Sequence, residues 1–413
     1  MSTYPNSSFS KRRVLLVATL LFGASSTAAA LDVDFGGRIQ EHTSFFSGSG
    51  KKTGATNDFP NGAKLRRADL FAKGSLGRDD LSFAIQYKMN GNVTETNSSH
   101  LQKAYLKWNC DNFHVNVGQQ YMPFGMQHTA SSSNLLFMER SAASDAAGLT
   151  RTWLGVNAGM MADMFTLNLS VATRGLEENN PLGIVNSDKY AYLVRATAVP
   201  MQGDEGTVHI GVDFKNRKFS TDDLAGVAQD TQGRIGTGME LQGRTNNGDV
   251  VNLRQQAVGA GTGTLKSQST YIVELAGAYN GVTLESEYFN TNYKFTGTST
   301  SQKTKSWYVQ AGYVLTGEQR TYSMASGVFK DPKPAGDNGA WEVALRYSAV
   351  DFTRTGNSIN GGKAKSWTAG VNWFVTDQVK FQANYNRAKF SFGPDATADR
   401  KIGAFGLGMQ LLF

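Results

Sequence analysis

The sequence predicts an all-β protein, a sixteen-stranded antiparallel transmembrane β-barrel, and three observations lead to it. Apolar and polar residues alternate over segments of about ten residues, close to the length of a tilted transmembrane strand and longer than most soluble strands. Aromatic residues recur at the ends of the apolar faces, as a membrane-interface girdle requires. Short turns alternate with long polar connections. Soluble β-sandwiches and propellers are the competing folds, and strand length argues most directly against them.

The N-terminal segment has the character of a secretory signal. Three cations at 11–13 precede an apolar run over 14–23, and small residues follow to Ala30. That order is typical of a cleaved signal peptide, and the apolar core is too short to span a bilayer. A short membrane anchor is the alternative. We therefore expect a signal peptide at residues 1–30 and a single barrel domain at residues 31–413.

Charge and cysteine content exclude several classes of protein. The chain has 41 Lys and Arg against 34 Asp and Glu, a formal charge of +7, and removing the three cations of the signal lowers it to +4. This mild excess gives no support to a nucleic-acid partner. Cys110 is the single cysteine, so an intrachain disulfide and a C-x-x-C zinc or redox site are both impossible. No run after Ala30 approaches about 18 apolar residues, which argues against a transmembrane helix.

The alternating segments follow one another along the whole mature chain. The clearest ones carry apolar residues at every second position, the period of a strand with two different faces. In chain order they are 81–89, 113–121, 165–171, 190–196, 208–214, 271–279, 282–288, 307–315, 341–349, 367–375, 379–385 and 405–413. Weaker candidates are 33–45, 65–74, 101–108 and 152–161. Together they make about sixteen strands, an even number.

A strand set with an apolar face toward lipid must close on itself. Backbone polar groups find no water in hydrocarbon, so an open sheet edge is not tolerated there. An apolar outer band also implies a polar lumen, and sixteen strands leave a water-filled channel. With an export signal in front of it, the predicted barrel belongs in an outer membrane.

Three connections are longer than ordinary hairpin turns. Residues 122–151 contain turn residues and the apolar run 135–137. A loop with its own apolar residues can fold inward, so we expect this third loop to enter the lumen and narrow it. Residues 220–269 are polar and rich in Gly, Gln and Thr, and residues 331–339 form a stiff polar excursion.

The side of each strand opposite to the apolar set carries more cations than anions. The inward cations are Arg67, Lys73, Lys88, Lys103, Lys107, Arg195, Lys215, Arg217, Arg346 and Lys380. The inward acids are Asp69, Asp213, Glu274, Glu285, Glu287 and Glu342. Basic side chains that face a pore raise the local concentration of anions, which is the physical basis of anion selectivity. The alternative is that each charge is paired on the wall and sets no selectivity.

The sequence contains no constellation typical of an enzyme, cofactor or metal site. Residues 48–53 lack the first glycine of a phosphate loop and the Ser or Thr that follows its lysine. The five histidines have no metal-ligand spacing, and G-x-S-x-G is absent. We therefore expect no catalytic activity and no cofactor.

Several sequence blocks carry a resemblance to a known family. They include Val-Gly-Gln-Gln-Tyr-Met-Pro-Phe-Gly-Met at 117–126, Phe-Met-Glu-Arg-Ser at 137–141, Trp-Tyr-Val-Gln-Ala-Gly-Tyr-Val-Leu-Thr-Gly-Glu at 307–318 and Gly-Val-Asn-Trp at 370–373. In this order they resemble the phosphate-selective porin family, porins O and P. The resemblance implies a homotrimeric outer-membrane channel whose eyelet is narrowed by an inward third loop.

The resemblance, together with strand parity for Lys103, indicates which residues face the ion. The candidates for anion binding are Arg66, Arg67, Lys103, Arg217, Arg234, Arg244 and Lys365. The candidates for the constriction loop are Pro123, Phe124, Gly125, His128, Glu139 and Arg140. Arg66 and Arg67 match the paired arginines of the family's constriction. Strand parity turns Arg67 inward and Arg66 toward lipid or the rim.

The chain departs from the family pattern in the third loop. Residues 127–134 read Gln-His-Thr-Ala-Ser-Ser-Ser-Asn, where the resemblance implies lysines. Gln102 stands where an acidic residue is expected. We expect an anion-preferring diffusion channel, for phosphate or related small anions, that forms a homotrimer in outer-membrane lipid. A general porin for small polar solutes is the alternative within transport, and a surface adhesin is the alternative outside it.

Overall fold

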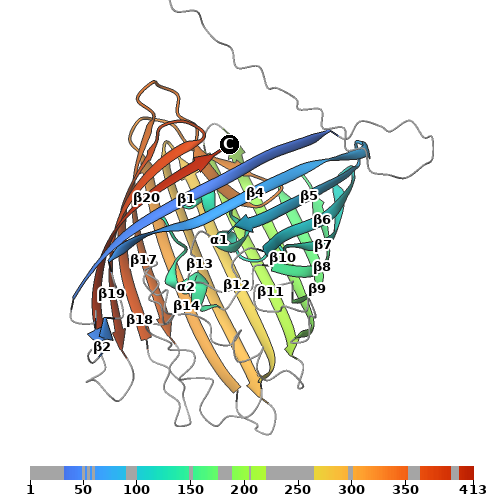
Figure 1. Ribbon diagram of the computed structural model, residues 1–413. Helices are drawn as coiled ribbons and strands as arrows, with labels where there is room; N and C mark the ends of the chain where they lie inside the picture. Colours follow the sequence, from blue (N-terminus) through green and yellow to red (C-terminus); the bar gives the residue numbers. More distant parts are fainter. Residues whose placement is uncertain are drawn as a thin grey trace, which may run out of the picture.

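The computed structural model shows a barrel of long, tilted strands (Figure 1). It describes residues 32–48, 52–53, 56–57, 61–89, 100–147, 152–174, 188–203, 206–219, 265–295, 301–351, 363–391 and 400–413. The signal peptide expected at residues 1–30 lies outside these ranges, and so do the candidate residues Arg234 and Arg244.

Sixteen of the described strands close into one antiparallel barrel, which confirms the predicted fold class. They are β1 (Val33–Ser47), β4 (Gly62–Arg78), β5 (Leu81–Met89), β6 (His100–Cys110), β7 (Phe113–Tyr121), β8 (Thr152–Met161), β9 (Phe165–Arg174), β10 (Asp188–Gly203), β11 (Gly206–Phe219), β12 (Leu265–Tyr279), β13 (Val282–Phe295), β14 (Ser301–Val314), β17 (Ala340–Asp351), β18 (Lys363–Phe374), β19 (Val379–Ser391) and β20 (Arg400–Leu412). Each strand pairs with its neighbour in this order, and β1 pairs with β20 to close the sheet. Gly37 and Phe413 exchange two backbone hydrogen bonds, so the closing ladder reaches the last residue.

The two faces of the barrel wall differ in polarity. On β12 the exposed side chains include Tyr271, Val273 and Leu275, whereas Ile272 and Glu274 between them are buried. A similar alternation, with polar residues among the buried positions, recurs on β17, β18 and β19. Apolar residues outside and charged residues inside reverse the pattern of a soluble barrel and are typical of a membrane-spanning one.

Aromatic side chains form contacts near both ends of the outer face. Trp341 and Trp373 stack at 5.2 Å between ring centroids near the end that holds the short turns. Tyr347 and Trp367 lie 4.6 Å apart toward the other end. Two such bands are the girdles that anchor a barrel at the two membrane surfaces.

The two ends of the barrel have different connections. The tight turns, such as Asn280–Gly281, share one end with Phe413 and the start of β1. Barrels of this class keep short turns on the periplasmic side and longer loops outside the cell. The short-turn end is therefore periplasmic. Between β1 and β4, at the other end, β2 (Lys52–Thr53) and β3 (Thr56–Asn57) form a separate two-stranded sheet.

Two connections carry structure of their own. The third loop, between β7 and β8, contains α1 (Met126–Thr129), η2 (Ser132–Asn134) and α2 (Ala142–Ala146). The connection between β14 and β17, at the short-turn end, folds into β15 (Arg320–Ser323) and β16 (Val328–Pro332), here called the turn hairpin. In the described part of the chain, none of the helices has the length and apolar character needed to cross a membrane.

Candidate functional site

Two carboxylates hold the first turn of the third loop. The backbone N–H groups of Met126 and Gln127 donate to the two oxygens of Glu287 on β13, at 2.6 and 3.0 Å. The N–H of Gly125 donates to Asp213 on β11 at 3.3 Å. Gly125 has φ 74°, which a glycine adopts without the steric cost of a Cβ. Gly125, Met126 and Gln127 thus present three consecutive N–H groups to buried acids.

The later part of the third loop is bonded to a different group of strands. The N–H of Met138 donates to the Asn384 side chain on β19 at 2.9 Å. The Asn372 amide on β18 donates to the carbonyl of Leu136 at 2.9 Å. The apolar run 135–137 is buried. The loop therefore contacts the polar, buried face of strands from β11 to β19, and α1 and α2 are drawn within the barrel outline (Figure 1).

A β-bulge in β4 turns two consecutive arginines toward the third loop. The register shifts between Gln40 and Glu41 of β1, so Arg66 is the extra residue of β4, and a bulge of this kind redirects a side chain. Arg66 Nε donates to Glu139 at 2.5 Å, and Arg67 donates to the other oxygen of Glu139 at 3.3 Å. The expectation that Arg66 points toward lipid or the rim was wrong. It assumed that side chains alternate strictly between the two faces of β4, and the bulge interrupts that alternation at Arg66.

Glu139 is a charged partner for both arginines. Burial alone would raise the pKa of its carboxyl group, but the guanidinium groups of Arg66 and Arg67 outweigh burial and hold that pKa well below the usual 4.5. Its backbone carbonyl also accepts two hydrogen bonds from Arg346 on β17, each 3.2 Å long. At neutral pH the two arginines and Glu139 together carry one net positive charge.

Arg140 secures the internal structure of the third loop. Its guanidinium donates to the backbone carbonyls of Gln127 at 2.7 Å and Ala130 at 2.8 Å. Hydrogen bonds from a charged donor are stronger than neutral ones. Arg140 therefore fixes the end of α1 against the segment that carries Glu139.

The other candidate residues of the third loop differ in exposure. Phe124 is buried, and the ammonium of Lys215 on β11 lies 5.6 Å from its ring centroid, within the range of a cation–π contact. Pro123 and His128 are half-buried. The candidate constriction residues thus occupy one continuous segment, with Phe124 and Arg140 packed and His128 partly accessible.

Arg195 of β10 holds the tip of the turn hairpin. Its guanidinium donates to the carbonyls of Ser326 at 2.7 Å and Gly327 at 2.9 Å. The same group is paired with Glu274 at 3.0 and 2.8 Å and lies 3.5 Å from Asp213. Because Asp213 also accepts from the first turn of the third loop, one ionic network joins the third loop and the turn hairpin.

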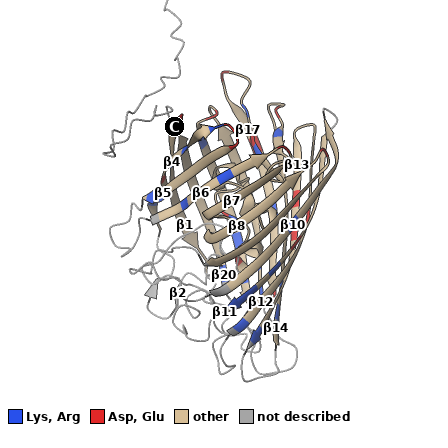
Figure 2. Ribbon diagram, turned by 90° about the vertical axis from the view of Figure 1, so that its right-hand side faces the viewer, with Lys and Arg blue, Asp and Glu red and all other residues tan. Residues whose placement is uncertain are grey.

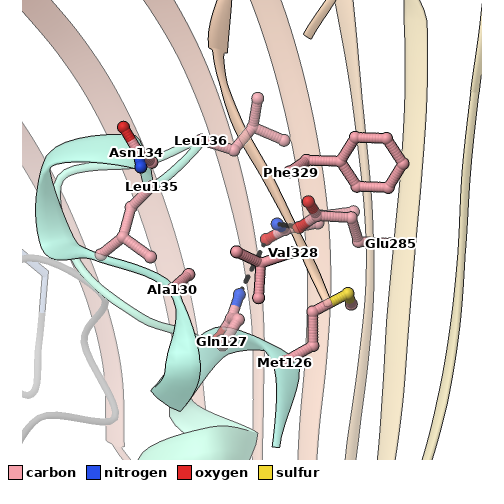
Figure 3. Close-up of a pocket in the computed structure, with 10 residues that line it drawn as sticks. Met126, Gln127, Ala130, Asn134, Leu135, Leu136, Glu285, Val328 and Phe329 are labelled. Atoms are coloured by element: carbon pink, nitrogen blue, oxygen red, sulfur yellow. Dashed lines mark hydrogen bonds between the residues drawn. The ribbon is translucent and has the colours of Figure 1, made fainter. Parts of the chain in front are cut away.

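The third loop and the turn hairpin also share an apolar contact. Met126, Ala130 and Leu135 pack with Val328 and Phe329, and Figure 3 shows these side chains around a small cavity. The cavity measures about 10 Å³, about the space that one water molecule needs. The two segments are therefore closely packed against each other.

Arg320 and Lys380 connect the turn hairpin to the third loop. Arg320 donates two hydrogen bonds of 2.7 Å to Glu342 on β17 and one of 3.2 Å to the carbonyl of Asn134. Lys380 on β19 pairs with Asp331 at 2.8 Å. Sequence reasoning missed Arg320 because it lies outside the alternating strands. The unusual length of the connection between residues 307–315 and 341–349 was the available signal.

Five of the six acids predicted to face inward are buried and paired: Asp69, Asp213, Glu274, Glu287 and Glu342. The sixth, Glu285, is half-buried and accepts a hydrogen bond from the Gln310 side chain. Glu139 of the third loop is also buried. Their partners are Arg38, Arg66, Arg67, Arg195 and Arg320, or, for Glu287, backbone N–H groups and the Tyr308 hydroxyl. This pairing is the wall arrangement that the sequence left open as an alternative for each charge.

The inner wall of β5 to β7 is more accessible and carries lysines. Lys88, Lys103 and Lys107 are half-buried there, and Lys103 lies 4.5 Å from the ring centroid of Tyr121. These three strands contain no Asp or Glu. Basic residues also gather near the long-loop ends of β11, β12 and β14 (Figure 2), but Lys303 and Lys305 of β14 are exposed on the outer face, which carries Trp307. On β5 to β7 the accessible inward charge is therefore positive.

The remaining candidates occupy different positions. Arg217 is buried and lies 4.6 Å from the ring centroid of Phe219 and 5.3 Å from that of Trp153. Lys365 does not face the lumen: its side chain is exposed on the outer face with Trp367. Residues two apart on a strand share a face, which explains this position. Among the described residues, no group of three or more His, Cys, Asp or Glu could hold a metal ion.

Sequence comparison identifies a family and two relatives of this chain. The family model for phosphate-selective porins O and P matches residues 33–413. Porin O of Pseudomonas aeruginosa is 27% identical over 409 residues, which cover 94% of this chain and 90% of that protein. An uncharacterized protein of Caulobacter vibrioides is 25% identical over 379 residues, covering 85% of this chain and 68% of that protein.

Solved structures share the barrel fold. The anion-selective porin from Comamonas acidovorans has a TM-score of 0.57 at 12% identity, covering 93% of this chain and 100% of that one. OmpT of Vibrio cholerae, in its trimer form, has a TM-score of 0.53 at 13% identity, with the same coverage of 93% and 100%. OprB of Pseudomonas putida has a TM-score of 0.57 at 12% identity, covering 92% and 94%. At these identities the likeness concerns the fold.

Proposed function

We propose that this chain, which belongs to the family of phosphate-selective porins O and P, forms a water-filled outer-membrane channel that prefers anions. One observation carries the proposal: the accessible inner wall of β5 to β7 holds Lys88, Lys103 and Lys107 and no acid. Fixed cations along a pore concentrate anions and repel cations. The anion-selective porin of Comamonas acidovorans, which shares the fold, supports the same choice.

In this proposal the third loop is the constriction. Its hydrogen bonds to β11, β13, β18 and β19 hold it against the polar face of the wall. The ion then passes between the loop and the lysines of β5 to β7. Arg66 and Arg67 lie where the loop meets β4 and add one net positive charge after pairing with Glu139.

Phosphate or a related small anion is the proposed cargo, and the family supports it. A general porin for small polar solutes is the second candidate, favoured by the absence of lysine in residues 127–134 and by the neutralising charge of Glu139. We further propose a homotrimer, as in the trimer form of OmpT of Vibrio cholerae. We also propose that residues 1–30 are removed on export. The proposed function requires no enzymatic step.

A competition experiment separates the two candidate cargoes. Purified channels in a planar bilayer are bathed in potassium chloride, and inorganic phosphate is added stepwise to both sides. A phosphate-binding channel loses chloride current at millimolar phosphate, because a bound anion occupies the constriction. Equal chloride currents with phosphate and with matched sulfate point to the general porin.

A further inference from the structure

Tyr105 on β6 differs from the other tyrosines inside the barrel. Each of those has a hydrogen-bond partner for its hydroxyl group: Tyr121 with Gln102, Tyr293 with Gln268, Tyr308 with Glu287 and Tyr322 with His209. In the part of the chain that the structure describes, Tyr105 is half-buried and has neither a hydrogen bond nor a ring contact. A tyrosine inside a protein usually has a partner for its hydroxyl group, so this side chain is left open to a ligand.

We propose that Tyr105, together with Lys103 and Lys107, binds small aromatic carboxylates that pass through the channel. The inference rests on the proposed anion-preferring channel and deepens it by naming a class of cargo. It concerns the accessible wall of β5 to β7, opposite the third loop.

The strand places Tyr105 between two cations. Lys103 precedes it by two residues on β6 and Lys107 follows it by two, and residues two apart share a face at a spacing of about 7 Å. Leu106 and Trp108 alternate with them and are exposed on the outer face. One aromatic ring therefore lies on the lumen side of β6 with an ammonium group on either side of it along the strand.

The two neighbouring strands leave space beside the ring. The register partners of Tyr105 are Ala84 on β5 and Gly118 on β7, and directly opposed residues lie about 4.5–5.5 Å apart. Gly118 has φ 131°, and a Cβ at this position would lie 2.8 Å from the Cα of Tyr105. Both the backbone conformation and this crowding exclude a larger residue there. Neither neighbouring strand thus places a side chain larger than a methyl group directly opposite the ring.

The three side chains match the two parts of an aromatic carboxylate. Aromatic rings attract each other in offset-stacked or edge-to-face arrangements, and the ammonium group of lysine is a compact charge with three donors for a carboxylate. Benzoate is the simplest ligand that carries both groups. Cyclohexanecarboxylate keeps the charge and the approximate size but has no aromatic ring. Tyr105 therefore discriminates between anions that the lysines alone treat alike.

Block of the chloride current tests the inference. Purified channels in a planar bilayer are bathed in potassium chloride at neutral pH, where benzoate and cyclohexanecarboxylate are both ionised, and each carboxylate is added stepwise. Tyr105→Leu removes the ring, and Tyr105→Phe keeps it. The matched control is Tyr87→Leu, at an exposed tyrosine on the outer face of the neighbouring strand β5.

The expected results depend on the ring of Tyr105. Wild type, Tyr105→Phe and Tyr87→Leu reach half-block at a benzoate concentration about threefold to tenfold below that of cyclohexanecarboxylate, the range expected for one aromatic pair. Tyr105→Leu responds equally to the two carboxylates. Equal block of wild type by both compounds, or a preference for benzoate that persists in Tyr105→Leu, overturns the inference. So does loss of the preference in Tyr87→Leu, which would assign the aromatic contact to the outer face.

The wild-type protein alone separates this inference from the proposed function. The comparison of the two carboxylates in wild type needs no variant, so it decides the matter even if Tyr105→Leu fails to assemble. A reversal potential without anion preference in a potassium chloride gradient overturns the proposed function and this inference with it. Anion preference combined with equal block by the two carboxylates overturns only the role of Tyr105.

Discussion

Arg66 of β4 and Glu139 of the third loop form an ion pair, 2.5 Å from Nε to Oε1, between residues 73 positions apart in the chain. The pair exists because a β-bulge turns Arg66 to the same side as Arg67. One carboxylate thus offsets one of the two arginines at the proposed constriction. The charge that a passing anion experiences there depends on Glu139 as much as on the arginines.

The first prediction concerns Glu139. Glu139→Gln keeps a hydrogen-bond acceptor for the arginines but removes the negative charge, so the anion/cation permeability ratio should rise about twofold for an ion about 8 Å away. Reversal potentials in a salt gradient measure this ratio. Glu318→Gln, at a half-buried acid of the short-turn end, is the control and should leave the ratio unchanged. A fall in the ratio for Glu139→Gln contradicts the assignment.

The second prediction compares the two arginines. Arg66→Ala and Arg67→Ala should each lower the anion/cation permeability ratio by a similar factor, about twofold, because both contact Glu139. The double change leaves Glu139 without these two cations and should lower the ratio most. Single-channel recordings of the three variants at one ionic strength provide the comparison. If Arg66→Ala has no effect while Arg67→Ala does, the bulge does not place Arg66 near the ion path.

The barrel could be predicted from the sequence because apolar residues recur at every second position of its strands. Alternation at every second residue located all sixteen strands and assigned Glu274 and Arg195 to the inner face. The bulge at Arg66 was not visible, since one extra residue reverses the parity beyond it without changing the composition. Lys365 was assigned to the pore by resemblance, although its two-residue spacing from Trp367 already places both on one face.

The turn hairpin could not be predicted for a different reason. Its strands are short, and its position is determined by contacts far away in the chain, from Arg195 to Ser326 and from Arg320 to Glu342. Local pattern contains no information about such partners. The sequence therefore indicated only a polar excursion over 331–339, whereas β16 already begins at Val328.

The third prediction tests the accessible wall. Lys103→Gln combined with Lys107→Gln removes two inward cations of β6, so the anion/cation permeability ratio should fall by about twofold to fourfold. The matched control is Lys365→Gln, which removes a cation from the outer face and should leave the ratio unchanged. An equal fall in the permeability ratio for both variants would show that selectivity does not depend on whether a lysine faces the lumen or the outside.

The fourth prediction concerns Arg195. Arg195→Met leaves the buried acids Glu274 and Asp213 without their main cation, and breaking a buried pair of this kind costs about 3–5 kcal/mol. We expect a lower thermal unfolding midpoint and noisier open-channel current, because the turn hairpin loses two hydrogen bonds. Arg195→Lys keeps the charge and should restore part of the stability. Unchanged open-channel noise with Arg195→Met would show that the turn hairpin does not influence the ion path.

The fifth prediction follows from the lowered pKa of Glu139. A carboxyl group whose pKa is lowered by folding adds stability above its usual value of 4.5, and that stability is lost as the pH falls through the folded pKa. Wild type should therefore unfold at a higher temperature than Glu139→Gln near neutral pH. The difference should shrink below pH 4.5. Thermal unfolding of both proteins across the acid range measures it, and a difference that grows in acid contradicts the ion pair.

The reversal potential of the unmodified channel tests the central claim most directly. Purified protein in a neutral planar bilayer separates two potassium chloride solutions of different concentration, and the potential at zero current is recorded. An anion-preferring pore gives a potential with the sign of the chloride gradient, and its size should decrease as ionic strength rises and screens the lysines of β5 to β7. A potential of zero, or one with the sign of the potassium gradient, would contradict the account.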